Sequence, residues 1–75
     1  MMPMSYRGIA DDLARRIREG EWPVGVRLPT TLEIAEEYGV SEATAYRATT
    51  VLVTWGLVFG TPGRGRFVVQ PPAGE

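Results

Sequence analysis

The sequence predicts a mainly α-helical domain with a small β-hairpin, an α+β class with three helices and a two- to three-stranded sheet. Three observations support this class. Residues 28–47 have the spacing of two helices joined by a tight turn, and a capping residue precedes each helix. An apolar stripe at helical spacing comes before them, and two apolar runs around a Gly/Pro-rich loop come after them. We interpret this order as a winged helix-turn-helix, in which the hairpin is the wing.

The first helix is expected from about Tyr6 to Glu19, with Ser5 as its N-cap and Gly20 as its stop signal. Its apolar residues recur at helical spacing and form one stripe: Tyr6, Ile9, Ala10, Leu13 and Ile17. Its last turn holds three cations, which suit the negative end of the helix dipole: Arg15, Arg16 and Arg18. We interpret these arginines as a solvated face.

Residues 21–27 have the composition of a turn, since they include Pro23 and Gly25. We expect Trp22 to cover the core beside the first helix. Residues 26–28 are predicted to form a short strand before the second helix.

The central helix pair is predicted from its caps. Thr30 and Glu33 form a capping box before a helix over about 31–38, and Gly39 ends that helix in a left-handed conformation. Ser41 caps a third helix over about 42–55. The apolar residues of the second helix are Leu32, Ile34, Ala35 and Tyr38. The core stripe of the third helix is Ala45, Ala48, Leu52 and Trp55, with Val51 beside it.

The positions of Ala35, Gly39 and Ala45 are those of a helix-turn-helix. The two alanines are small where the helices cross, and we expect Ala45 to face Ala35 while Val40 packs in the turn. A helix pair of this kind usually places its second helix in the major groove of DNA.

The hairpin is expected from two apolar runs, 57–60 and 66–69, joined by a Gly/Pro loop over 61–65. The domain is therefore predicted over residues 6–69. Residues 1–5 are expected to form a tail, and residues 70–75 a linker or frayed end.

The composition excludes several kinds of site. The chain has 75 residues, 44% of them hydrophobic, which suits one small domain. It holds no cysteine, histidine or lysine, so the usual general base, zinc ligand and Schiff-base amine are missing. We expect no enzyme, no cofactor and no metal. No apolar run spans a membrane and no signal peptide is present, so we expect a cytoplasmic protein without a membrane partner.

The charge distribution matters more than its sum of −1. DNA-binding proteins are usually basic, because neutralisation of phosphates supplies much of their affinity. In this chain most acids lie within residues 11–42, and every cation is arginine, which makes bidentate contacts with phosphate and guanine.

The third helix supplies the candidate DNA-reading residues from its first half: Ser41, Glu42, Ala43, Thr44, Tyr46 and Arg47. The hydroxyls could bind phosphate or a base, Arg47 could reach guanine, and Glu42 could accept from cytosine N4. Each also has a structural alternative. These are a cap for Ser41, plain exposure for Thr44, an ion pair of Arg47 with Glu42 or Glu36, a lid of Tyr46 on the first helix, and stabilisation of the helix start by Glu42.

Two further segments are candidates for contact with the DNA backbone. Thr30 and Thr31 begin the second helix, where free N–H groups and two hydroxyls suit a phosphate, although simple capping explains them as well. The wing carries two arginines between glycines, and an arginine at a hairpin tip can enter a minor groove: Gly63, Arg64, Gly65 and Arg66. The alternative for the wing is a glycine-rich turn with solubilising charges.

The whole pattern resembles the DNA-binding domain of the GntR family of bacterial transcription regulators over about residues 6–69. The matching pieces are Tyr6, Ile9, Leu13, Gly20, residues 24–29, residues 33–35, residues 38–41, Thr44, residues 52–57, residues 63–65, Phe67 and Val68. The resemblance implies a winged helix-turn-helix that binds operator DNA as a dimer, usually as a repressor. It carries over Ser41, Thr44, Arg64 and Gly65 by position. It also implies a C-terminal effector domain, and since the chain ends at Glu75 we expect either a fragment or a single-domain member.

Three positions depart from the family pattern. Leu32, Glu42 and Tyr46 stand where family members typically carry arginines that touch DNA. Two hypotheses follow for the partner of this domain. The first is operator DNA, bound by two copies that pair on it. The alternative is a protein-interaction module with weak or no DNA binding, in which these three residues form the contact surface.

Overall fold

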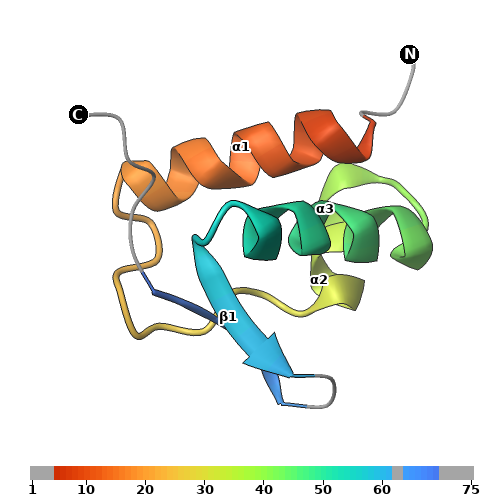
Figure 1. The fold of residues 1–75 in the computed structure, drawn as a ribbon. Helices are drawn as coiled ribbons and strands as arrows, with labels where there is room; N and C mark the ends of the chain where they lie inside the picture. Colours follow the sequence, from red (N-terminus) through yellow and green to blue (C-terminus); the bar gives the residue numbers. More distant parts are fainter. Residues whose placement is uncertain (1–4, 62–63, 70–75) are drawn as a thin grey trace.

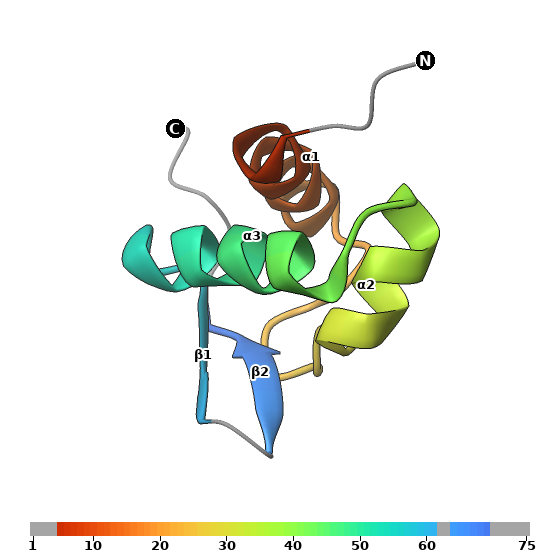
Figure 2. The same cartoon turned by 90° about the vertical axis from the view of Figure 1, so that its right-hand side faces the viewer.

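The computed structural model describes residues 5–61 and 64–69. It shows three helices, α1 (Tyr6–Arg18), α2 (Thr31–Tyr38) and α3 (Glu42–Thr54), and two strands, β1 (Val58–Thr61) and β2 (Gly65–Val68). Helix α1 lies above α3, and the hairpin extends from the opposite side of α3, away from α1 (Figures 1 and 2). This confirms the winged helix-turn-helix. The predictions for residues 1–4, for Gly63 and for the linker at 70–75 lie outside the described residues.

Helix α1 begins and ends close to the predicted positions. The Ser5 Oγ accepts a hydrogen bond from the Gly8 N–H at 3.2 Å, and Glu19 is the C-cap. The predicted stripe faces the core: Ile9, Ala10, Leu13 and Ile17 are buried, and Tyr6 packs against them. Burial of such a stripe is the main source of stability for a helix of this length.

The helix pair forms as its caps predict. Thr30 Oγ1 accepts from the Glu33 N–H at 3.1 Å, and Glu33 Oε1 accepts from the Thr30 N–H at 2.9 Å, which completes the capping box. Gly39 ends α2 at φ 68°, a conformation that costs other residues more. Ala35 and Ala45 are both buried, as expected where the two helices meet.

One core prediction for the helix pair is wrong. Trp55 was expected in the core but is 46% exposed, because it caps the end of α3 and the chain turns at Gly56. Leu57 takes the core position instead, and its N–H donates to the Leu52 carbonyl at 3.0 Å. Leu32 is an apolar residue of α2 that is 53% exposed, as the alternative hypothesis of a contact surface requires. Thr49 of α3 is buried and donates to the Tyr46 carbonyl.

The wing has a third segment beside its two strands. Strands β1 and β2 pair antiparallel with Phe59 opposite Phe67, one residue away from the predicted bounds. Residues 25–28 run along the other edge of β2, with a bridge from Arg27 to Phe67. The Gly25 N–H donates to the Val68 carbonyl and the Leu28 N–H to the Arg66 carbonyl, both at 2.8 Å. The predicted short strand is thus present as a bridged segment.

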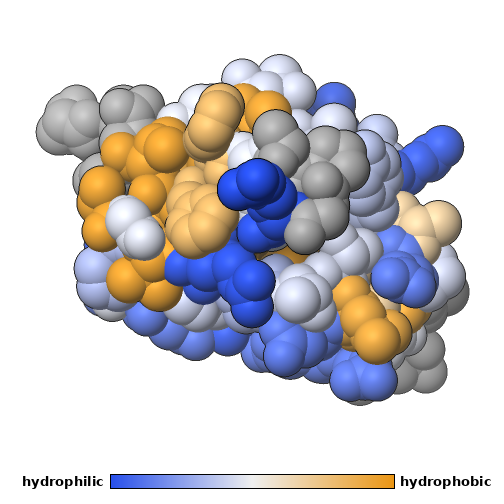
Figure 3. Space-filling view, turned by 90° about the horizontal axis from the view of Figure 1, so that it is seen from below, coloured by the Kyte–Doolittle hydropathy of each residue, from blue (hydrophilic) through white to orange (hydrophobic). Residues whose placement is uncertain are grey.

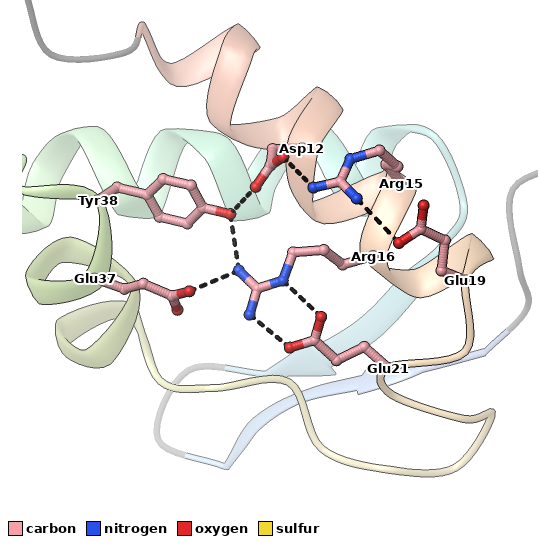
Figure 4. A network of polar contacts seen from close by, with 7 residues as sticks. All are labelled: Asp12, Arg15, Arg16, Glu19, Glu21, Glu37 and Tyr38. Carbon is pink, nitrogen blue, oxygen red and sulfur yellow. Dashed lines mark hydrogen bonds and ion pairs between the residues drawn. The ribbon is translucent and has the colours of Figure 1, made fainter.

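A polar network joins α1 to α2 (Figure 4). Arg16 donates to the Glu21 carboxylate at 2.6 and 2.9 Å and to the Tyr38 hydroxyl at 2.9 Å, and it forms an ion pair with Glu37 at 2.9 Å. Its guanidinium also lies 4.5 Å from the centroid of the Trp22 ring, which packs against the core as predicted. The prediction of a solvated face is therefore wrong for Arg16, whose side chain is only 14% exposed.

The network also shifts the pKa of its acidic groups. The hydrogen bond from Tyr38, followed by that from Arg15, lowers the pKa of Asp12 below its ordinary value. Burial, followed by the hydrogen bond to Asp12, raises the pKa of Tyr38 to about 12. Both shifts favour an ionised Asp12 beside a neutral Tyr38, the two groups joined by the contact drawn in Figure 4.

Candidate nucleic-acid interface

A groove of about 330 Å³ separates the start of α2, the first half of α3 and the wing. Figure 3 shows this side of the molecule, with strongly hydrophilic side chains near the middle of the face and apolar ones on either side. The groove is lined by Arg27, Pro29, Thr30, Thr31, Leu32, Glu42, Thr49, Arg64, Gly65 and Arg66. Three cations therefore face a surface that carries one acid.

Arg27 is the charged residue of the groove lining that the sequence analysis did not select. The bridge to Phe67 places it beside β2, and its Cδ lies 2.8 Å from the position that a Cβ on Gly65 would occupy. Only a glycine at position 65 lets the Arg27 side chain pass this close to the wing. The predicted strand at 26–28 could have identified Arg27 as a site residue, because pairing this strand with the hairpin would have placed Arg27 next to Arg66.

The start of α2 offers two N–H groups to the groove. Thr30 is occupied by the capping box, as one alternative for it predicted. The N–H groups of Thr31 and Leu32 make no hydrogen bond within the described part of the chain, as expected for the first turn of a helix. Together with the positive end of the helix dipole, these groups suit a phosphate oxygen.

The exposed surface of α3 is divided into two sides. Tyr46 faces the wing, since the guanidinium of Arg66 lies 5.7 Å from the centroid of its ring. Arg47 faces α1, where its guanidinium lies 5.6 Å from the ring of Tyr6. Two alternatives are therefore wrong. Tyr46 does not form a lid on α1, and the ion pairs of the described residues do not include Arg47.

Ser41 and Thr44 form a hydrogen-bonded pair at the start of α3. Ser41 Oγ accepts from the Thr44 N–H at 3.1 Å and donates to Thr44 Oγ1 at 3.0 Å. The capping role of Ser41 is confirmed, and Thr44 is half-buried rather than plainly exposed. Because Ser41 supplies the hydrogen between the two oxygens, the Thr44 hydroxyl keeps its own hydrogen for a further acceptor.

The structure brings together six of the predicted residues along the groove: Thr30, Thr31, Glu42, Arg64, Gly65 and Arg66. Tyr46 lies at its edge through Arg66, whereas Ser41, Ala43, Thr44 and Arg47 lie outside its lining. Their roles in DNA contact stay predictions. Within residues 5–61 and 64–69, no group of three or more His, Cys, Asp or Glu could hold a metal. In the same part of the chain, no helix is long and apolar enough to cross a membrane.

Comparison with known proteins adds a family match to this geometry. Residues 5–68 match the model of a family described as bacterial regulatory proteins, gntR family. The HTH-type transcriptional repressor NagR of Bacillus subtilis (strain 168) is 37% identical over 70 residues, which cover 93% of this chain and 28% of NagR. The chain spans between 14% and 28% of the length of three curated relatives that it matches.

Two solved complexes with DNA have the same fold. The DNA-binding domain of AraR, in complex with operator ORR3, is 29% identical with a TM-score of 0.82, over 92% of this chain and 83% of that chain. BusR of S. agalactiae, in complex with its busAB-promotor DNA, is 27% identical with a TM-score of 0.82, over 93% of this chain and 34% of that chain.

Proposed function

Because the chain belongs to the GntR family of bacterial regulatory proteins, we propose that it is the DNA-binding domain of a transcription regulator. The observation that carries this proposal is the groove, in which three arginines from two distant segments border the first half of α3. The family is one of regulators and not of enzymes. We therefore propose that the domain has no catalytic role and acts in the cytoplasm, where bacterial DNA is found.

In the proposed complex, α3 enters the major groove of operator DNA and the wing follows the adjacent minor groove. The operator complexes of AraR and the promoter complex of BusR support this, since both proteins share the fold. Helix α3 would present Glu42, Ala43 and Tyr46 to the base edges. Thr44 would donate its remaining hydroxyl hydrogen to a phosphate.

Phosphate contacts would come from the rim of the groove. Arg64 and Arg66 lie on the wing, and Arg27 is held beside them by its bridge to β2. The N–H groups of Thr31 and Leu32 would bind a further phosphate at the start of α2. This local concentration of cations explains how a chain with net charge −1 can bind DNA.

Regulation would be by repression, as the name of NagR indicates for that relative. Two copies would bind a pair of half-sites about one helical turn, roughly 34 Å, apart. We propose that the chain is a monomer in solution and pairs only on DNA. The domain would comprise residues 6–69, with 1–5 as a tail and 70–75 as a linker or tail. Sedimentation at micromolar concentration tests the monomer, and a stable dimer without DNA would contradict it.

A second candidate function is a protein-interaction module. Leu32 and Tyr46 favour it, because each is 53% exposed beside the groove. A partner of this surface would bind whether or not DNA is present. Recovery of a partner by pull-down, together with no affinity for duplex DNA at low salt, would support this candidate over the first.

The test of the proposed function is in-vitro selection from random duplex DNA at about 50 mM salt, where phosphate contacts are strong. A nearly palindromic motif is the expected result and would identify the operator. DNA recovered without a motif would reduce the function to contact with the backbone. No recovery would transfer the assignment to the protein-interaction module.

A further inference from the structure

Glu42 is the acidic residue of the groove, and helix geometry fixes which way it faces. It is the first residue of α3 and lies four residues before Tyr46, so the two share one side of the helix. Arg66 lies over the ring of Tyr46, and Glu42 lines the groove together with Arg64 and Arg66. The carboxylate therefore belongs to the side of α3 that faces the wing and, in the proposed complex, the DNA.

The carboxylate of Glu42 is not used inside the domain. Within the described residues it makes no ion pair and no hydrogen bond, and its side chain is exposed. The acids that form ion pairs in the described residues all pair with Arg15 or Arg16 of α1: Asp12, Glu19, Glu21 and Glu37. Its charge suits the start of α3, but that role needs no approach to the groove.

We propose that Glu42 selects cytosine in each operator half-site by accepting a hydrogen bond from the cytosine N4 amino group. This inference rests on the proposed function and names the base that the helix reads. An ionised carboxylate can only accept hydrogen bonds. In the major groove, guanine presents two acceptors, N7 and O6, and thymine presents the O4 acceptor and a methyl group. Both bases therefore leave the carboxylate without a donor.

The choice between the two remaining bases follows from their edges. Adenine offers the N6 amino group next to the N7 acceptor, whereas cytosine offers its N4 amino group without an acceptor beside it on the same base. A single carboxylate therefore fits cytosine best. Guanine is rejected most strongly, because its two acceptors would face the desolvated carboxylate of Glu42 and neither could donate a hydrogen bond to it.

The arginines of the groove offset the repulsion between the Glu42 carboxylate and the DNA phosphates. Arg27, Arg64 and Arg66 line the same groove and would bind the phosphates on either side of the base that Glu42 contacts. The Glu42 carboxylate weakens binding to every DNA sequence, and this loss of affinity is smallest where cytosine is present. Glu42 thus gives discrimination at the cost of total affinity.

The experiment compares three forms of the chain in the same selection from random duplex DNA: the wild type, Glu42→Gln and Glu36→Gln. Glutamine keeps the length of the side chain and contacts adenine through N6 and N7. Glu36 is exposed on α2 and does not line the groove, so Glu36→Gln is a matched control with the same loss of charge. Affinities are then measured for the selected duplex and for duplexes that replace the enriched cytosine.

The wild type and Glu36→Gln are expected to share a motif with one cytosine in each half-site. Replacing that cytosine should weaken wild-type binding by about 5- to 100-fold. The Glu42→Gln variant should lose this preference in favour of adenine and bind unrelated duplexes more tightly than the wild type. A motif that keeps the cytosine in Glu42→Gln, or a wild-type motif without such a position, overturns the inference and leaves the DNA-binding function intact. Recovery of DNA without a motif by all three forms also overturns the inference and reduces the function to contact with the backbone. Failure of all three forms to recover any DNA overturns the proposed function together with the inference.

Discussion

The hydroxyl of Tyr38 donates to Asp12 Oδ2 at 2.5 Å, and this contact joins the end of α2 to the middle of α1. Arg16 donates to the same hydroxyl from the other side. The tyrosine is thus held by two residues of α1 that lie 22 and 26 positions away in the sequence. The contact therefore fastens α2, the first helix of the helix-turn-helix, to α1.

Replacing Tyr38 by Phe should destabilise the fold by about 1–3 kcal/mol, because Asp12 and Arg16 both lose a partner in a half-buried site. The free energy of unfolding in urea measures the effect. Tyr46→Phe is the matched control, since it removes the same hydroxyl from an exposed ring and should change stability by less than about 0.5 kcal/mol. Equal effects of the two variants would contradict the role of the network.

Acid should remove the contribution of Asp12. Its pKa in the folded chain lies below the ordinary value of 3.8, so the ionised form stabilises the fold at pH values above 3.8. This stability is lost as the pH falls below 3.8 and through the folded pKa. The difference in urea midpoint between the wild type and Asp12→Asn should therefore shrink between about pH 6 and pH 2. Asp11→Asn, at an exposed neighbour, is the control, and its difference from the wild type should vary far less.

The three groove arginines should each contribute to the salt dependence of DNA binding. Each phosphate contact accounts for about one unit of slope in a plot of log affinity against log salt. Replacing Arg64 and Arg66 together by Ala should reduce the slope by up to about two, and adding Arg27→Ala should reduce it by about one more. Arg18→Ala removes an exposed arginine outside the groove and should leave the slope almost unchanged. If Arg18→Ala matched the effect of Arg27→Ala, the assignment of Arg27 would be wrong.

Gly65→Ala should weaken DNA binding as well as stability. Gly65 has φ 93°, so alanine there is strained by about 1–2 kcal/mol, and its Cβ would displace the Arg27 side chain. Gly20 has a similar φ of 87° with nothing within 4 Å of an added Cβ, so Gly20→Ala carries the strain alone. Fluorescence anisotropy with an operator duplex should show a loss for Gly65→Ala only. A loss of the same size in both variants would mean that Arg27 is not held for DNA contact.

The parts of the fold that depend on neighbouring residues could be predicted from the sequence. The capping box of Thr30 and Glu33, the left-handed Gly39 and the cap at Ser41 each involve residues no more than four positions apart. Such contacts are fixed before tertiary packing is known. The apolar stripe of α1 was equally readable, because one helical period decides which residues are buried.

What the sequence did not reveal depends on distant partners. In the sequence, Arg16 does not differ from other charged residues near a helix end. Its role comes from its contacts with Tyr38 and Trp22, which only the folded chain provides. Arg27 becomes part of the groove only through its bridge to β2. Leu57 and not Trp55 is buried in the core because the chain turns at the end of α3. The helical spacing of apolar residues does not show where this turn occurs.

The hydrogen bonds between residues 25–28 and β2 have a consequence for the dynamics of the wing. The amides of Gly25, Leu28 and Val68 all donate across this seam, and Val69 donates to the Leu57 carbonyl. In native-state amide exchange with deuterated water, these four amides should open together with the helices and not as a separate unit. The base of the wing then does not unfold separately from the helices, so a protein reaching DNA carries the backbone of the wing base already in position.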